Sequence, residues 1–168
     1  VDLSVLYAED NNFSDISVLG NLNGLKEINL SNNKIQDLSG FSNVAEGRSY
    51  LWLADFSRNE VTSLQGIETL NNLRILALSQ NSISNLSPLN QMSELSTLLI
   101  DFNQVSLLSP IKDLENLRGL YANNNLLAED PSVIEMNQLA ELYIYDNNLT
   151  DNRKVEIQDA LSSVRIEF

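Results

Sequence analysis

The polar residues that could carry chemistry in this sequence are mostly asparagines, some of which stand in acidic runs such as Asp10-Asn11-Asn12 and Asp146-Asn147-Asn148. Clustered amide and carboxylate oxygens are ligands that calcium prefers. These runs, however, lack the spacing of a calcium-binding loop, in which ligands alternate and a glycine follows. An asparagine amide can also donate and accept hydrogen bonds together, which suits it to satisfying backbone groups. We therefore expect these asparagines to be structural, and we predict no metal site.

The asparagines recur at a regular interval, with gaps of 22, 26, 22, 22, 22 and 22 residues. The seven in-phase positions are Asn11, Asn33, Asn59, Asn81, Asn103, Asn125 and Asn147. Apolar residues keep fixed distances from them, and residues 73–92 follow the pattern L-x-x-L-x-L-x-x-N-x-I-x-x-L-x-x-L-x-x-L. This is the signature of a leucine-rich repeat, built from one strand and one return segment. We predict that the asparagines hydrogen-bond the backbone beside each strand and form a ladder between repeats.

Catalytic residue types are scarce. The chain has no His and no Cys, which removes Ser-His-Asp and Cys-His nucleophile chemistry and the commonest metal ligands. No glycine-rich phosphate loop, dinucleotide fingerprint or G-x-S-x-G motif is present. Carboxylate pairs could serve a glycosidase. With 23 acidic residues, however, most carboxylates must be solvated surface. We predict that the protein is not an enzyme and has no cofactor.

Composition narrows the class of partner. The formal net charge is −13, whereas binding to nucleic acid requires clustered Lys and Arg. No stretch of 18 consecutive apolar residues is present, so we expect no membrane insertion. Leu3 already stands at a consensus position, so we expect that a preceding signal or cap has been removed or lies outside the sequence. Another protein is the class of binding partner that remains. We also expect the protein to be a monomer.

Periodicity within each repeat predicts its local structure. The L-x-L core alternates with period two, which indicates a short strand with inward leucines. After the asparagine the apolar spacing becomes three, which favours extended turns or a 3₁₀ turn. Recurrent bends are expected at Gly40, Gly66, Pro88 and Pro110, each seven residues after its asparagine. In repeat six, Asp130 precedes Pro131, and this pair predicts a short helical turn over 131–136.

These patterns divide the chain into two parts. Residues 1–149 form seven repeats, interrupted by four extra residues within Ala45–Tyr50, and residues 150–168 form a C-terminal cap. In the cap, one apolar helix face is predicted at Ile157, Ala160, Leu161 and Val164, and Val164, Ile166 and Phe168 then alternate as a last strand. The predicted fold is an α/β solenoid with a concave parallel β-sheet, a return side of extended turns and 3₁₀ segments, and a helical C-terminal cap.

The 22-residue unit, with Ser87-Pro88-Leu89 and Ser109-Pro110-Ile111, resembles the bacterial internalin-type leucine-rich repeat. The resemblance covers essentially the whole chain. It implies a curved solenoid whose concave sheet binds another protein. It also implies a protein that is secreted or displayed on a bacterial cell surface.

Three positions per repeat, lying six, four and two residues before each asparagine, should point out of the concave sheet. Large apolar groups among them form a diagonal, and acids flank it without any basic residue. Exposed apolar patches and tyrosines are typical of interfaces. The predicted partner-binding residues are Leu53, Asp55, Ile75, Leu99, Asp101, Tyr121, Glu141, Tyr143 and Tyr145, and the acids predict a partner with a basic patch. The alternative is that the tyrosines pack on one another and stiffen the sheet.

The leading hypothesis is therefore a protein-binding module, extracellular or at a bacterial cell surface. A second hypothesis is a structural spacer that self-assembles through an unpaired edge at Val1–Glu9. A third is an intracellular regulator built on the same repeats, because no pattern in the sequence assigns a compartment. Trp52 is expected either to pack under the insertion at Ala45–Tyr50 or to be exposed for binding.

Overall fold

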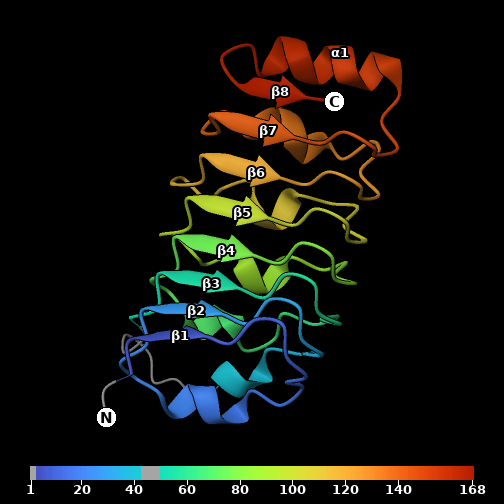
Figure 1. Ribbon diagram of the computed structural model, residues 1–168. Coiled ribbons are helices and arrows are strands. Elements are labelled where there is room, and N and C mark those ends of the chain that lie inside the picture. Colours follow the sequence, from blue (N-terminus) through green and yellow to red (C-terminus); the bar gives the residue numbers. More distant parts are fainter. Residues whose placement is uncertain (1–2, 43–49) are drawn as a thin grey trace.

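The computed structural model describes residues 3–42 and 50–168, which stack as successive repeats along one axis (Figure 1). One parallel sheet runs the length of the stack, with its strands in sequence order. The strands are β1 Val5–Tyr7, β2 Glu27–Asn29, β3 Leu53–Asp55, β4 Ile75–Ala77, β5 Thr97–Leu99, β6 Gly119–Tyr121, β7 Glu141–Tyr143 and β8 Arg165–Glu167. Each strand pairs in register with the same positions of the next repeat. The predicted solenoid with a parallel sheet is confirmed.

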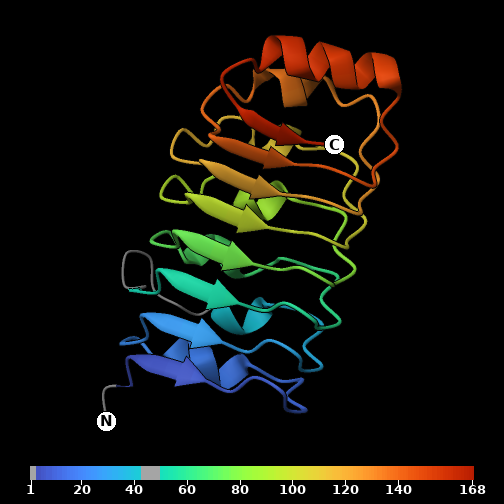
Figure 2. The same cartoon turned by 45° about the horizontal axis from the view of Figure 1, so that its top comes forward.

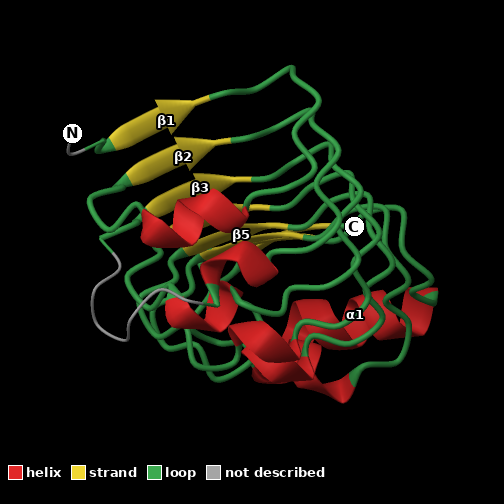
Figure 3. Ribbon diagram, turned by 90° about the horizontal axis from the view of Figure 1, so that it is seen from below, coloured by secondary structure: helices red, strands yellow, loops and turns green. Residues whose placement is uncertain are grey.

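The central residue of each inner strand points into the core, as the L-x-L alternation predicts. Leu76, Leu98 and Leu120 are fully buried there. The return side carries 3₁₀ turns, which lie opposite the strands (Figure 3). These turns are η1 Ser17–Asn21, η2 Ser39–Phe41, η3 Ile67–Thr69, η4 Ser87–Leu89, η5 Ser109–Ile111 and η6 Pro131–Glu135. The apolar spacing of three thus places at least one buried apolar residue on each short turn without forming an α-helix.

Repeat six contains the helical turn expected after Asp130. The turn η6 begins at Pro131, and the Asp130 carboxylate accepts a hydrogen bond from the backbone N–H of Ser132. Asp130 is buried, and its second carboxylate oxygen accepts from the backbone N–H of Leu108 in the preceding repeat. The aspartate therefore replaces an apolar core residue but satisfies two backbone groups in exchange.

The C-terminal segment closes one end of the stack (Figures 1 and 2). Helix α1 spans Asp151–Ala160, and the Thr150 hydroxyl accepts from the Arg153 backbone N–H as its N-cap. Strand β8 pairs with β7. The buried face of the segment differs from the predicted one, because Ala160 is exposed and Arg153 is buried. The buried stripe is therefore Arg153, Ile157 and Leu161, with spacing i, i+4 and i+8.

From Asn33 onward, the repeat asparagines hydrogen-bond both their own repeat and the one before it, whereas Asn11 donates to Ala8 and Glu9 of its own repeat. In one buried example, Asn103 Nδ2 donates to the carbonyl oxygens of Leu78 at 3.0 Å and Ile100 at 3.1 Å. Its Oδ1 accepts from the backbone N–H of Ile83 at 2.9 Å. The same pattern recurs at Asn33, Asn59, Asn81 and Asn125. Each of these asparagines thus satisfies backbone groups of its own repeat and of the one before it.

Replacing Asn103 by alanine should lower stability by roughly 1–3 kcal/mol, because it leaves buried backbone partners without hydrogen bonds. For a chain of this size, the melting temperature should fall about 2–4 °C per kcal/mol. Thermal unfolding followed by circular dichroism measures this loss. The matched control is Gln104→Ala, since Gln104 is the next residue and is exposed. Equal melting temperatures for the two variants would contradict a structural ladder.

The residue before each asparagine adopts a left-handed backbone conformation, with φ between 51° and 59°. These residues are Asp10, Asn32, Arg58, Gln80, Phe102, Asn124 and Asp146. Asn and Asp tolerate this conformation well, whereas a bulky residue such as Phe102 rarely adopts it. The repeated turn is therefore imposed by the solenoid and not by the residue type alone.

The first repeat departs from the predicted burial. Leu3 and Phe13 stand at consensus apolar positions but are exposed. Among the described residues, no repeat stacks on the outer side of β1, so these side chains lack a covering layer. Val44 and residues 45–49 of the predicted insertion lie outside the described residues, and Tyr50 at its end is exposed.

Candidate functional site

The outward side chains of the strands form the concave face, and the structure places the predicted apolar diagonal on it. Leu53 pairs in register with Ile75 on the next strand, and Leu99 pairs with Tyr121. All four are half-buried, whereas Tyr145 beyond β7 is exposed. These side chains leave the core, so folding alone does not require them to be large and apolar.

Four residues of this face contact one another, namely Tyr121, Glu141, Tyr143 and Arg165, and we call them the tyrosine cluster. The rings of Tyr121 and Tyr143 stack with their centroids 4.7 Å apart. The Tyr121 hydroxyl donates to Glu141 Oε2 at 2.8 Å. The Arg165 guanidinium lies over the Tyr143 ring, 5.6 Å from its centroid. The alternative considered from the sequence, in which the tyrosines pack on one another, is therefore present for Tyr121 and Tyr143, and both side chains are only half-buried.

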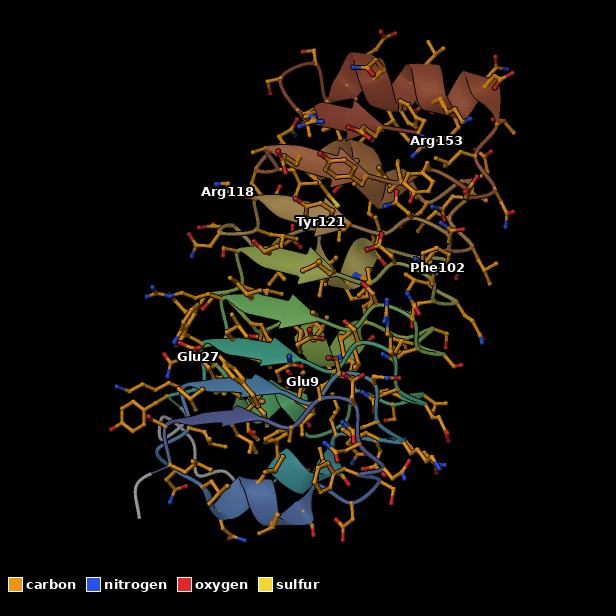
Figure 4. The ribbon with its side chains drawn as sticks, viewed as in Figure 1. Glu9, Glu27, Phe102, Arg118, Tyr121 and Arg153 are labelled. Carbon is orange, nitrogen blue, oxygen red and sulfur yellow. The ribbon has the colours of Figure 1, made fainter. Side chains whose placement is uncertain are left out.

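A glycine makes room for this cluster. A Cβ atom at Gly119 would lie 3.3 Å from the Tyr121 ring, closer than ordinary van der Waals contact. Gly119 also stands in register between Thr97 and Glu141 on the neighbouring strands. The missing side chain therefore lets the Tyr121 ring lie across the sheet (Figure 4).

Hydrogen bonding raises the pKa of Tyr121 above the ordinary tyrosine value, because its hydroxyl donates to Glu141, and partial burial adds to the effect. The hydroxyl of Tyr7 donates to Glu27 at 2.8 Å, and this bond likewise raises the pKa of Tyr7. A raised pKa in the folded state means that the bond stabilises the fold fully below about pH 10. The stabilisation is lost as the pH rises through the raised pKa.

The two Tyr–Glu pairs give a matched prediction. Glu141→Ala should lower the pKa of Tyr121 toward the ordinary value and leave that of Tyr7 unchanged, whereas Glu27→Ala should do the reverse. An NMR titration of ¹³C-labelled tyrosines at alkaline pH resolves the five phenols individually. Titration curves for Tyr121 and Tyr7 that respond to neither substitution would show that these hydrogen bonds do not form in solution.

The predicted acidic residues lie on the concave face, but each already has a local partner. Asp101 accepts from the backbone N–H and the Nδ2 of Asn123, at 3.0 and 2.7 Å. Asp55 accepts from the backbone N–H of Ser57, and Glu141 accepts from Tyr121. A carboxylate with one such bond keeps free lone pairs and its charge. These acids therefore remain able to attract a basic partner.

Two contributors to the face were not among the predicted partner-binding residues. Arg165 joins it because β8 extends the sheet by one strand, so the face does contain a basic residue at that end. Its partners are Glu167 at 2.8 Å and Glu141 at 3.8 Å. Asn123 is buried and bonds both Asp101 and the Tyr145 backbone, which fixes the loop after β6. The alternation of Val164, Ile166 and Phe168 was a signal that could have placed Arg165 on this face.

Trp52, just before β3, is 36% exposed.

Within the described residues, no three carboxylate groups come together in a way that could hold a metal ion. No helix in this part of the chain has the length and apolar character needed to cross a membrane. The candidate site is the concave face of the sheet, which carries aromatic and acidic side chains.

An asparagine ladder, one three-residue strand per repeat and short 3₁₀ returns together define a leucine-rich repeat protein. A family described as leucine-rich repeats (two copies) matches residues 2–43. None of the curated proteins matches the chain in sequence. Among solved structures, an internalin (inlF) of Listeria monocytogenes is 25% identical with a TM-score of 0.87, covering 99% of this chain and 50% of its own.

A leucine-rich repeat protein of Leptospira interrogans is also 25% identical, with a TM-score of 0.86, covering 95% of this chain and 41% of its own. Internalin C2 of Listeria monocytogenes, at 25% identity, has a TM-score of 0.68 and covers 99% of this chain and 77% of its own. The chain thus spans half or less of the length of the first two. Its fold is that of a leucine-rich repeat protein and resembles bacterial internalins, and such folds are typical of protein–protein interaction modules.

Proposed function

We propose that this chain is a non-catalytic binding module that recognises a partner protein through its concave face, secreted or at a bacterial cell surface. The observation that carries the proposal is the tyrosine cluster, which places two stacked aromatic rings on a face that folding does not require to be aromatic. Tyrosine presents a large contact area with few rotatable bonds and is enriched at interface hot spots. The half-buried Leu53, Ile75 and Leu99 extend the same face toward β3.

Charge adds a preference for the partner. The outward positions of the strands carry Glu27, Asp55, Asp101 and Glu141, in a chain whose net charge is −13. Complementary charge speeds diffusional encounter and suppresses wrong partners more than it raises affinity. The proposed partner therefore presents a basic patch around an apolar centre.

A display experiment tests this proposal with a defined probe. The folded chain is used to select binders from a library of random peptides displayed on phage. The proposal predicts enriched peptides that combine Lys or Arg with apolar residues and that associate faster at low salt. Enrichment of acidic peptides only, or of none at all, would contradict a concave face that selects basic partners.

A second candidate function is self-association, favoured by a different observation. Beside β1 lies an apolar hollow of about 310 Å³, lined by Leu3, Leu6, Phe13, Ile16 and Leu22 among others. Among the described residues, no strand pairs with the outer side of β1, and an unpaired edge next to apolar surface invites pairing with another strand. Sedimentation velocity at concentrations from micromolar to millimolar separates the candidates. The proposed binding module sediments as a monomer throughout, whereas concentration-dependent dimers would favour assembly through β1.

A further inference from the structure

The positions directly before the strands form a continuous row along one edge of the sheet. Backbone hydrogen bonds join them in order, since Trp52 N donates to Lys26 O, Arg74 N to Trp52 O and Ser96 N to Arg74 O, each at 2.9 Å. The same ladder continues from Arg118 N to Ser96 O and from Ala140 N to Arg118 O. We call this set the rim row, and its members are Lys26, Trp52, Arg74, Ser96, Arg118 and Ala140.

Three of the ten basic residues of this acidic chain lie in the rim row, directly before β2, β4 and β6. Lys26, Arg74 and Arg118 are all exposed, and Arg118 lies at the edge where its strand begins (Figure 4). Within residues 3–42 and 50–168, none of the three forms an ion pair, whereas Arg165 pairs with Glu141 and Glu167. Among the described residues, the rim row therefore holds cations that form no ion pair with a carboxylate.

Arg118 is also held in place. Its Nη1 donates to the carbonyl oxygens of Glu115 at 2.7 Å and Gln138 at 3.0 Å. These bonds fix the side chain while leaving its charge available. Of the strand residues that directly follow the three cations, Glu27 is charged, whereas Ile75 and Gly119, which follow Arg74 and Arg118, are not.

The spacing of these cations selects a ligand shape. Neighbouring strands lie about 4.8 Å apart, so the backbone positions of Lys26, Arg74 and Arg118, which precede alternate strands, stand about 9.6 Å apart. A polyproline II helix has three residues per turn and a rise of about 3.1 Å, which repeats one face about every 9.3 Å. Acidic residues at every third position of such a segment would meet Lys26, Arg74 and Arg118 in turn. Aromatic side chains are the usual docking surface for prolines, and Trp52 lies between the first two cations.

We propose that the rim row binds a polyproline II segment of another protein, with an acidic residue at every third position. This contact is separate from the concave face and does not depend on the function proposed for it. The carboxylates pair with the three cations, and the proline rings between the first two pack on Trp52. No covalent step is involved.

Trp52 is the single tryptophan of the chain, so its fluorescence reports on the rim row directly. The probe is the synthetic peptide (Glu-Pro-Pro)₄, capped at both ends. Its control has the same composition, with the four glutamates in one block. We call the first peptide in-phase, because its glutamates recur at every third position, and the control blocked. At low salt the in-phase peptide should change the Trp52 emission and bind at least about fivefold more tightly than the blocked peptide. Added salt should weaken the binding of both peptides. Equal affinities would reduce the contact to non-specific charge attraction and overturn the proposal.

Substitutions locate the contact. Lys26→Ser/Arg74→Ser should weaken the in-phase peptide about tenfold, since each exposed pair accounts for up to about fivefold. Serine is compatible with the row, because Ser96 already occupies it. The matched control Lys34→Ser removes an exposed charge outside the row and should change the affinity less than twofold. The proposal is wrong if the peptide leaves the Trp52 emission unchanged, or if Lys34→Ser weakens binding as much as Arg74→Ser alone.

Discussion

A chain that ends at residue 149 should lose cooperative unfolding and aggregate. Helix α1 and strand β8 cover the last repeat with Ile157, Leu161 and Val164, each at most 5% exposed. Burying three such side chains contributes about 5–9 kcal/mol, which is comparable to the whole stability of many domains, about 5–15 kcal/mol. Without this cover, Leu142 and Ile144 of repeat seven would face water.

Thermal unfolding followed by circular dichroism, with light scattering recorded in parallel, measures this effect. The control is Val155→Ala in the full chain, because Val155 lies on the exposed side of α1. It should melt within about 1–2 °C of the wild type, as exposed substitutions usually change stability by less than about 0.5 kcal/mol. A truncated chain that stays monomeric and melts sharply at the wild-type temperature would show that residues 150–168 are not a cap.

Asp130→Ala should destabilise the fold by about 2–4 kcal/mol. The substitution leaves the backbone N–H of Leu108 buried without an acceptor, which costs about 1–3 kcal/mol. It also removes the N-cap of η6, which should lower the free energy of unfolding by a further amount of about 0.5–2 kcal/mol. Urea denaturation measures the change in free energy of unfolding.

The matched control for this prediction is Asp113→Ala. The Asp113 side chain is 88% exposed and lies 3.7 Å from Lys112, so its loss should cost less than about 0.5 kcal/mol. If Asp130→Ala proved as stable as Asp113→Ala, the buried hydrogen bonds of Asp130 could not be the reason that this acid replaces an apolar residue.

The repeat pattern predicts most of the fold because each position is determined by its neighbours in a short, repeated unit. The inward leucines, the asparagines and the Asp130–Pro131 start of η6 are local signals. The burial of Arg153 was not predicted, because a helical apolar pattern favours Ala160 on the buried face. Arg153 is buried because α1 packs against repeat six, where Arg153 Nη2 donates to the Asp130 carbonyl oxygen at 2.7 Å.

The concave face is predicted in outline and not in detail. Spacing alone identifies which side chains leave the core, including Tyr121 and Tyr143. It does not show that the two rings stack or that Gly119 leaves room for them, since these depend on cross-strand geometry. Arg165 was missed because the outward positions were counted from the asparagines, and β8 follows the last of them.

The central claim, recognition of a partner by the concave face, is tested most directly by the affinity of a selected binder for Tyr121→Ala/Tyr143→Ala. Alanine suits the strand, because Ala77 occupies the equivalent position of β4. The control, Ser87→Ala/Lys112→Ala, alters the return side. We expect the tyrosine variant to stay folded and to bind at least about thirtyfold more weakly, which corresponds to a loss of about 2 kcal/mol of binding free energy. The control should keep full affinity. Full affinity in a folded tyrosine variant would contradict the claim and move the site off the concave sheet.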